Sequence, residues 1–391
     1  MPGTSAIIFV PDDTSRTGAA RPTLLLPVLG CPLLRWVASS LLASGIRRVF
    51  LVCHARYAEA ALACFSASMQ VTVSRDQDAP ELLHVFLSTS DAADEEVTVL
   101  TGPVVMLRGE TGQSRTPRSR SVAWGVDRQG FMDALDDTFD LLGFLRRSGR
   151  PLTESDGFFP VSGPEDLPAC AAQLKRSRNQ ELIRRGVTVW DMDNCYVEPG
   201  VFVSPGAELL PGTILRGRTA IGEGCVIGPN SYIENAVIGA GTTVNASQIY
   251  DSTVGSDTTV GPFAYIRPGS RIGSHVKAGD FVEIKNSTVG DGTKISHLTY
   301  VGDTDLGRSC NLGCGTVTVN YDRVNKYRTT VEDNCFIGCN TNLVAPVTVG
   351  EGAYIAAGST ITDDVPPAAL AVARARQTNK KDWAARNKVK K

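Results

Sequence analysis

Residues 254–273 read VGSDTTVGPFAYIRPGSRIG, and an aliphatic residue occupies every sixth position. Val254, Val260, Ile266 and Ile272 begin successive hexapeptides. A run rich in glycine and valine with this spacing does not fit the period of an α-helix. A period of six is typical of a parallel β-helix, in which each hexapeptide forms one side of a coil. This stretch therefore predicts a solenoid of short parallel strands.

The same repeat continues on both sides of this stretch, with occasional shifts of frame. Three hexapeptides make a coil of about 18 residues, so residues 197–361 predict roughly nine coils. The frame lapses between Leu312 and Val331, where CGTVTVNYDRVNKYRTT contains turn-forming residues. Such an interruption usually maps to a loop on one face of a solenoid, often the binding face. The other repeat positions are Ile221, Ile227, Ala278, Ile284, Val289, Ile295, Val301, Leu306, Ile337, Leu343, Val349, Ile355 and Ile361.

The first hundred residues follow a different pattern, in which short apolar strands alternate with amphipathic segments. This βαβ series predicts a parallel sheet with helices on its faces, as in a Rossmann-like α/β domain. We expect a polar loop at 109–123 and a helical connector at 165–186. The expected strands are 6–10, 48–53, 71–74 and 97–100, and the expected helices are 32–45, 58–65 and 80–88.

Composition limits the class of protein. The chain has 391 residues and a formal net charge of −2, which gives no general reason to expect nucleic acid or an anionic membrane as partner. The start MPGTSAIIFVPDD lacks a basic region, so we expect no signal peptide. The most apolar stretch, LLLPVLGCPLL, is broken by prolines and a glycine, so we expect no membrane span. Ten cysteines then favour a reducing compartment, and we expect the cytoplasm.

The repeats contain a candidate proton acceptor. His297 stands two residues after Ile295, at a position that should face outward. A surface histidine without a function is the alternative. Polar and cationic residues lie in neighbouring coils, which favours a site, because an imidazole flanked by cations is suited to take a proton near neutral pH and the cations suit a phosphorylated substrate. These residues are Arg267, Lys285, Tyr300, Asn311, Asn320 and Lys326.

The cysteines of the repeats raise the question of a metal. Cys310 with Cys314, and Cys335 with Cys339, form two CxxxC pairs. Cys310 and Cys335, like Cys225, each fall four residues after an apolar repeat position, where a β-helix needs a small side chain. We therefore interpret these three as packing residues and predict no metal site.

Several blocks of this half resemble one family. GPFAYIRPGS, GDFVEIKNSTVGDGTKISHLTYVGD, NLGCGTVTVNYD, NKYRT, NTNLVAPVTVGEGAYIAAGS and ALAVAR, all between about residues 260 and 380, are similar to the bacterial bifunctional glucosamine-1-phosphate acetyltransferase/N-acetylglucosamine-1-phosphate uridyltransferase. The resemblance implies a left-handed β-helix that assembles as a homotrimer, with each active site between subunits. It also implies acetyl-CoA and glucosamine 1-phosphate as small-molecule substrates.

The resemblance assigns roles to single residues. His297 matches the catalytic base. The phosphosugar positions match Arg267, Lys285, Tyr300, Asn311 and Lys326, and the acetyl-CoA positions match Cys314, Asn320, Tyr321, Cys339, Ala357 and Arg374. The family usually has alanine where Cys314 stands and serine where Cys339 stands. Both thiols are small enough for the coenzyme to bind there.

The N-terminal half departs from the family. Its order of elements and the segment GVTVWDMDNCYVEPGV resemble the uridyltransferase domain, but FVPDDTSRTG replaces the glycine-rich nucleotide loop. Thr23 stands for the lysine, Pro103 for the metal-binding aspartate, and VSGP (161–164) for the paired asparagines. We therefore expect that uridyl transfer is lost and magnesium is not needed. The expected segments are a degenerate nucleotidyltransferase-like domain (1–164), a connector (165–190), the β-helix (191–364) and a basic tail (365–391).

Three functions remain open. The first is an acetyltransferase that forms N-acetylglucosamine 1-phosphate for UDP-N-acetylglucosamine and the cell envelope. The second is a bifunctional enzyme that also transfers uridyl groups through an unusual site. The third is a non-catalytic scaffold trimer, against which the intact set of His297, Lys326 and Arg374 argues.

Overall fold

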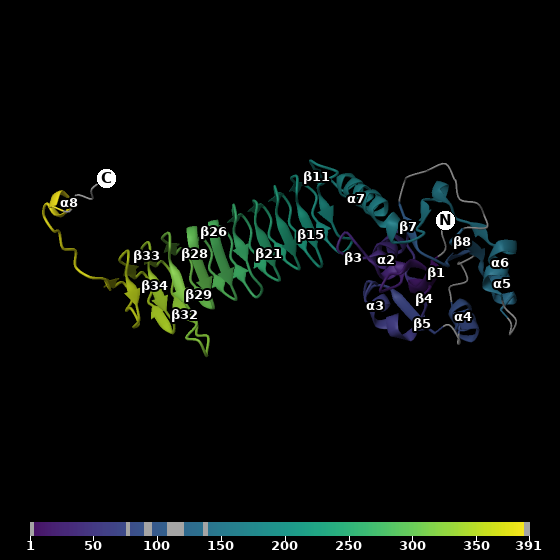
Figure 1. Cartoon of the computed structure of the whole chain (residues 1–391), viewed down its shortest axis with the longest axis horizontal. Helices are drawn as coiled ribbons and strands as arrows, with labels where there is room; N and C mark the ends of the chain where they lie inside the picture. Colours follow the sequence, from purple (N-terminus) through teal and green to yellow (C-terminus); the bar gives the residue numbers. More distant parts are fainter. Residues whose placement is uncertain (1–3, 76–78, 90–95, 108–120, 136–139, 387–391) are drawn as a thin grey trace. The chain divides into compact units, whose positions relative to one another are not determined.

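The computed structural model describes residues 4–75, 79–89, 96–107, 121–135 and 140–386. Its contacts divide the chain into two compact units (Figure 1). The first comprises Met1–Val201 with Ile214–Gly217, and the second Phe202–Thr213 with Arg218–Lys391. The four segments expected from the sequence stay a prediction.

The first unit contains a six-stranded sheet in the order β5-β4-β1-β6-β8-β9. The four predicted strands are confirmed as β1 Ser5–Val10, β4 Arg48–Cys53, β5 Gln70–Ser74 and β6 Glu96–Leu100, and they run parallel. The sheet also contains two strands that were not predicted, and both are antiparallel: β8 (Ala123–Asp127) runs antiparallel to β6, and β9 (Arg150–Pro151) runs antiparallel to β8. Residue 123, expected in a loop, begins β8, and residues 109–120 of that loop lie outside the described part.

Alternation along β1 divides the core of this unit between the two faces of the sheet. Ala6 and Ile8 pack with the apolar face of α2, whereas Ile7 packs with α4, α5 and α6. The three predicted helices are confirmed as α2, α3 and α4, and the connector as α7, which ends before Gly186 at φ 87°. The other elements are α1 Thr14–Thr17, β2 Pro27–Val28, β3 Cys31–Pro32, α2 Leu33–Ala43, α3 Ala58–Leu62, α4 Ala79–Ser88, β7 Val104–Met106, α5 Arg128–Asp133, α6 Leu141–Ser148, β10 Phe158–Pro160, α7 Leu167–Arg184, β11 Thr188–Val189, β12 Tyr196–Val197 and β15 Ile214–Arg216.

The second unit is the predicted parallel β-helix, with short strands stacked on three sides (Figure 1). The aliphatic residue of each hexapeptide is buried, as the repeat predicts: Val260, Ile266 and Ile284 are all 0% exposed. Hydroxyls next to this core bind carbonyls of the adjacent coil, as Thr293 Oγ1 does with Gly307 O at 2.8 Å. Burial of one aliphatic row per side and hydrogen bonds between coils therefore hold the solenoid together.

The strands of the three sides are as follows. The first side has β14 Glu208–Leu209, β17 Val226–Ile227, β20 Thr243–Val244, β23 Thr259–Val260, β30 Asn311–Leu312, β33 Phe336–Ile337, β36 Tyr354–Ile355 and β38 Leu370–Ala371. The second has β18 Tyr232–Glu234, β21 Gln248–Tyr250, β24 Tyr265–Ile266, β31 Val317–Val319, β34 Asn342–Val344 and β37 Thr360–Ile361. The third has β13 Phe202–Val203, β16 Ala220–Ile221, β19 Val237–Ile238, β22 Thr253–Val254, β25 Arg271–Ile272, β27 Thr288–Val289, β29 Thr304–Leu306, β32 Thr329–Val331 and β35 Val347–Val349.

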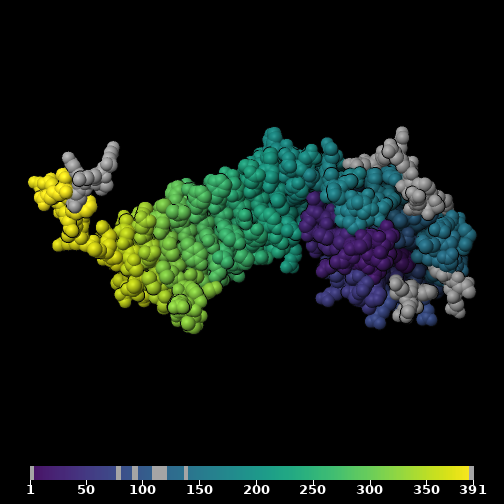
Figure 2. Space-filling view, viewed as in Figure 1, coloured from purple at the N-terminus to yellow at the C-terminus, as the bar shows by residue number. Residues whose placement is uncertain are grey.

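Two features interrupt this regularity. The strands β26 (Lys277–Lys285) and β28 (Lys294–Gly302) continue through a corner of the coil and pair over their whole length. Between β31 and β32, residues 320–328 leave the coil and project from its side near β32 (Figures 1 and 2). The loop predicted from the lapse of the repeat is therefore confirmed. The described part of the tail contains α8 (Trp383–Arg386).

In the described residues, none of the helices combines the length and the apolar character needed to cross a bilayer.

Candidate active site

His297 lies at the corner through which β28 passes. The register of β26 and β28 sets Asp280 directly beside it. Nδ1 of the imidazole lies 2.6 Å from Oδ1 of Asp280. The two side chains are 55% and 39% exposed, so a substrate in solution can reach the pair.

This hydrogen bond determines which imidazole nitrogen is available. The bond from His297 holds the pKa of Asp280 below its usual range, so this carboxylate is ionised at neutral pH and can only accept. Nδ1 therefore carries the donated proton, and Nε2 of the neutral ring keeps a lone pair. Asp280 thus orients His297 as a proton acceptor.

Asp280 was not among the predicted site residues, although the repeat contains the signal for it. Asp280 stands two residues after Ala278, as His297 stands two residues after Ile295, and the two are 17 residues apart. That separation is one coil. Any residue at this repeat position in the preceding coil lies beside His297.

Residues expected at the acetyl-CoA site continue this column. The strands β28, β30, β33 and β36 pair in register through the aliphatic residue of each. Arg374 lies beside the last coil of the column, because its Cδ is 3.7 Å from the position that a Cβ would take on Gly358. The residues two places after each aliphatic residue stack at one corner in successive coils, and they are His297, Cys314, Cys339 and Ala357.

Three residues expected to hold the phosphosugar gather on the second side of the coils. The register of β24, β26 and β28 sets Arg267 and Lys285 in adjacent coils. Arg267 binds Glu283 at 2.8 Å. The ring of Tyr300 lies over Gly302, where an added Cβ would stand 2.3 Å from the tyrosine hydroxyl. Because Gly302 has no side chain, the ring of Tyr300 can lie there, next to the cations.

Asp303 connects this group to the loop. It is 5% exposed, accepts a hydrogen bond from Asn286 at 2.6 Å and another from Asn320, and lies 3.5 Å from Nζ of Lys285. Burial raises the pKa of Asp303, but the two amides and the ammonium outweigh burial and hold this pKa below its usual range. The ionised carboxylate thus fixes one cation and one loop residue.

Lys326 adds a further positive charge from the projecting loop. The neighbouring Lys285 is the main cause that lowers the pKa of Lys326, and Arg267 lowers it further. This repulsion between cations shows that the carboxylates of Asp303 and Glu283 do not neutralise all of the positive charge in the cluster. An anion bound between Lys285 and Lys326 would relieve it, so the cluster suits a phosphate group.

The structure separates the remaining expected residues. Asn311 begins β30 on the first side of the coils, in register with Lys294, so the His297 corner lies between it and the cations of the same chain. Asn320 binds Asp303, and Tyr321 pairs with Lys326 across the loop. Within one chain, these two residues therefore lie with the cation cluster rather than with the column of Cys314 and Cys339.

The cysteines provide no metal site in the described residues, where no group of three or more potential ligands occurs. Cys225, Cys310 and Cys335 are buried, and burial raises the pKa of the Cys310 thiol to about 11. Their expected role as packing residues agrees with this burial. Cys314 and Cys339 are exposed.

In the first unit, the segments expected at the nucleotide site do come together, but with other residues. Val161 donates its N–H to the carbonyl of Pro103 at 3.0 Å, and Arg16 binds the carbonyl of Ser162 at 2.7 Å. Asp13, which is 8% exposed, accepts from the N–H and hydroxyl of Thr23 at 2.9 and 2.6 Å.

The Asp13 carboxylate therefore pairs with both donors of Thr23, the residue at the expected lysine position. It also binds Arg16 at 3.1 Å, while Arg56 forms an ion pair with the adjacent Asp12. The donors that could meet a phosphate are thus paired with the chain's own carboxylates, and a nucleotide phosphate would be repelled by Asp13. Pro103 offers no side-chain ligand at the position of the expected aspartate.

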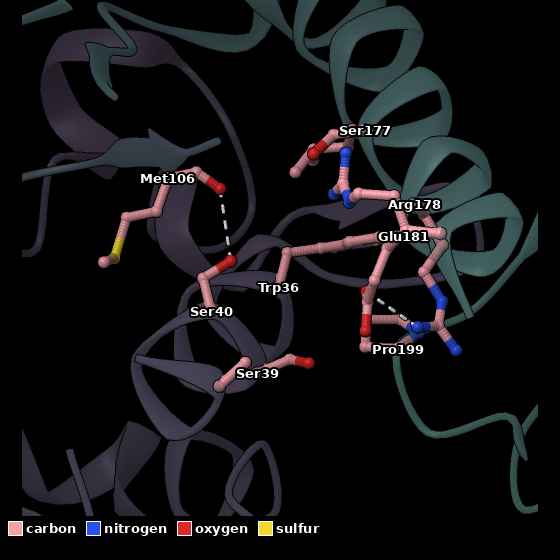
Figure 3. Close-up of a pocket in the computed structure, with 11 residues that line it drawn as sticks. Trp36, Ser39, Ser40, Met106, Ser177, Arg178, Glu181 and Pro199 are labelled. Carbon is pink, nitrogen blue, oxygen red and sulfur yellow. Dashed lines mark hydrogen bonds and ion pairs between the residues drawn. The ribbon is translucent and has the colours of Figure 1, made fainter. Parts of the chain in front are cut away.

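A separate cavity of about 50 Å³ lies between α2 and α7 (Figure 3). Ser40 donates to the carbonyl of Met106 at 3.1 Å, and Arg178 binds Glu181 at 2.8 Å and the carbonyl of Val201 at 2.7 Å. These groups already have partners within the unit. None of the residues that line this cavity was predicted as a site residue, and we assign the cavity no role.

Comparisons with known proteins agree with the repeat pattern. Residues 328–363 match the bacterial transferase hexapeptide family (six repeats), and residues 218–246 match the hexapeptide repeat of succinyl-transferase. The bifunctional protein GlmU of Brevibacillus brevis is 49% identical over 250 residues, which are 63% of this chain and 54% of that protein. GlmU of Clostridium kluyveri is 47% identical over 260 residues, 64% of this chain and 56% of that protein. The predicted resemblance to the bifunctional family is confirmed.

The hexapeptide matches also confirm the predicted fold class, a left-handed parallel β-helix that follows a Rossmann-like α/β domain. The chain spans about half the length of the curated relatives that it matches. Among solved structures, the UDP-N-acetylglucosamine acyltransferase of Arabidopsis is 16% identical, covers 44% of this chain and 70% of its own, and has a TM-score of 0.28. The inositol-1-phosphate CTP transferase from T. maritima is 12% identical, covers 45% and 97%, and has a TM-score of 0.32. Scores this low carry no argument.

Proposed function

We propose that this protein transfers the acetyl group of acetyl-CoA to the amine of glucosamine 1-phosphate. The observation that carries this proposal is the Asp280–His297 pair, which starts the column of Cys314, Cys339 and Ala357 and lies beside the cation cluster. The product, N-acetylglucosamine 1-phosphate, would supply UDP-N-acetylglucosamine for the cell envelope.

His297 acts as the general base. Nε2 removes a proton from the sugar amine as the nitrogen attacks the thioester carbonyl. The imidazolium then returns this proton to the leaving sulfur, and coenzyme A departs as the thiol. Asp280 keeps Nδ1 protonated and stabilises the imidazolium that forms. Such positioned bases contribute roughly 10²–10⁴-fold to a rate.

The cation cluster binds the phosphate of the sugar. Arg267, Lys285 and Lys326 supply charge, and the lowered pKa of Lys326 marks a place where an anion is favoured. Tyr300 completes this side of the site. Asn311 lies across the His297 corner in the same chain, so a second subunit would be needed to bring it to a sugar bound at the cations.

An exposed apolar column supports the assembly of a homotrimer. Phe263, Phe281 and Leu298 occupy one corner in successive coils, next to Asp280 and His297, and are 59%, 58% and 59% exposed. The two rings stack with centroids 5.5 Å apart. Three large apolar side chains in a row favour a protein partner, and a second copy of this chain fits a site that one chain leaves incomplete.

We further propose that uridyl transfer is lost. The carboxylate of Asp13 on Thr23 and Arg16 supports this loss, because it takes the donors that a nucleotide phosphate would need. The alternative, a bifunctional enzyme, is favoured by the description of the GlmU relatives as bifunctional and by the meeting of the segments around Pro103 and Val161. We propose that the protein lies in the cytoplasm. We propose neither a nucleic acid nor a membrane as its partner.

The test of this function is coenzyme A release, followed with a thiol reagent in the presence of acetyl-CoA and glucosamine 1-phosphate. We expect release that depends on the amino sugar and falls roughly 10²–10⁴-fold in His297→Ala. No release by the folded protein would overturn the proposal and leave the scaffold as the better reading. Pyrophosphate release from UTP with magnesium would restore the bifunctional alternative.

A further inference from the structure

Two coils of the β-helix contain two stacked pairs of cysteines. Cys310 directly precedes β30 and Cys335 directly precedes β33, and these strands pair in register. Cys314 and Cys339 follow the same two strands at equivalent positions. Each cysteine therefore lies beside its counterpart in the neighbouring coil.

The two pairs differ in environment. Cys310 and Cys335 are each 1% exposed, and their thiols donate to the carbonyls of Glu332 at 3.0 Å and of Gly350 at 3.1 Å. Burial raises the pKa of both thiols. Cys314 and Cys339 are exposed. Since thiolates react and buried thiols are inert, only the outer pair is open to an oxidant.

The backbone around the outer pair is compatible with a disulfide. The N–H of Asn340 donates to the carbonyl of Cys314 at 2.8 Å. A Cβ added to Gly313 would lie 2.9 Å from Sγ of Cys339, so this sulfur leans toward the coil of Cys314. Paired strands are about 4.8 Å apart, within the roughly 4.4–6.8 Å that separates the Cα atoms of disulfides.

We propose that Cys314 and Cys339 form a reversible disulfide when the protein meets a hydroperoxide, and that this disulfide stops acetyl transfer. One thiolate attacks an oxygen of hydrogen peroxide and gives a sulfenic acid and hydroxide, and the hydroxide takes up the proton that the thiol released to become water. The second thiol attacks that sulfur, which forms the S–S bond and releases a second water. Hydrogen peroxide is reduced, the two thiols are oxidised, and a dithiol reverses the reaction.

The effect on turnover rests on the proposed function. Cys314 follows His297 directly in the column, and the bond would fix both sulfurs at the corner where the resemblance places the thioester. Transient disulfides of this kind occur in reducing compartments as redox sensors. The buried pair of the same two coils serves as an internal comparison.

The test exposes the reduced full chain to graded hydrogen peroxide, with thiol counting, peptide mass spectrometry and acetyl transfer measured on each sample. We expect the loss of two thiols per chain, a cross-linked peptide pair containing Cys314 and Cys339, and a loss of activity in proportion, all reversed by dithiothreitol. For the Cys339→Ser variant, each peroxide-treated sample is compared with an untreated sample of the same variant. The cross-link should be absent, and the loss of acetyl transfer in proportion to it should disappear.

Cys310→Ala is the matched control and should leave the cross-link unchanged. A cross-link between Cys310 and Cys335, or no cross-link while acetyl transfer proceeds, would overturn the inference, as would a cross-linked protein with undiminished turnover. A chain that cross-links at Cys314 and Cys339 but never transfers acetyl would support the disulfide and overturn the proposed function alone.

Discussion

Replacing Asp280 with asparagine or alanine separates the two contributions of this carboxylate to His297. Asparagine keeps an oxygen that can accept the Nδ1–H but removes the charge, whereas alanine removes both. We expect the rate of acetyl transfer to fall least in Asp280→Asn, more in Asp280→Ala and most in His297→Ala. The loss in Asp280→Asn reports the charge, and the additional loss in Asp280→Ala reports the orientation of the imidazole. The loss in His297→Ala reports the general base itself.

The magnitude follows from the geometry. The bond is short, at 2.6 Å, but the side chains are 55% and 39% exposed. Exposed ion pairs contribute little because water and salt screen them, so loss of the charge alone should lower kcat roughly two- to fivefold. Loss of orientation as well should bring the decrease to about tenfold, well below the roughly 10²–10⁴-fold expected for His297→Ala.

The assay is coenzyme A release at saturating acetyl-CoA, with low and high salt compared. The loss in Asp280→Asn should shrink at high salt, because screening already weakens the charge in the unaltered protein. Asp291→Asn is the matched control, since its carboxylate is also exposed but accepts from the backbone N–H of Ser274 at 2.7 Å. Unaltered turnover in Asp280→Ala would refute the reasoning.

Three further predictions follow from the second unit. Lys326→Ala should raise the KM for the phosphosugar about tenfold or more and leave the KM for acetyl-CoA nearly unchanged, and equal effects in steady-state kinetics would contradict a phosphate contact. Asp303→Ala should lower the free energy of unfolding by about 1–3 kcal/mol in denaturant titrations, because it leaves the buried amide of Asn320 unpaired. As the folded-state pKa of Asp303 is lowered, its stabilisation is present above roughly pH 3.9 and is lost as the pH falls through the folded-state value, so variant and unaltered protein should converge in acid. If the protein forms the proposed trimer, Phe281→Glu should convert it into monomers in sedimentation experiments, and a trimer that persists would place the interface elsewhere.

The sequence predicted the β-helix because the geometry of a coil imposes the period of six on every side. It also predicted an outward His297, since the position follows from Ile295. Asp280 escaped notice although Ala278 was recognised as a repeat position, because only cationic, amide and tyrosine side chains were considered as neighbours of His297. The pairing becomes visible only when the register of one coil against the next is known.

The parts that were missed depend on contacts between distant segments. β8 is short and antiparallel, and it follows residues that read as a polar loop. The position of Asn320 is set by its hydrogen bond to Asp303 in the preceding coil. The match to a family could not show that Asn320 lies with the cations of its own chain, because that arrangement depends on the path of the projecting loop.

The most direct test of the central claim is a single reaction that contains acetyl-CoA, glucosamine 1-phosphate, UTP and magnesium, with the sugar products identified by mass spectrometry. We predict that N-acetylglucosamine 1-phosphate accumulates and is not converted to UDP-N-acetylglucosamine. Glucosamine 1-phosphate that remains unmodified in the presence of the folded protein would contradict the account.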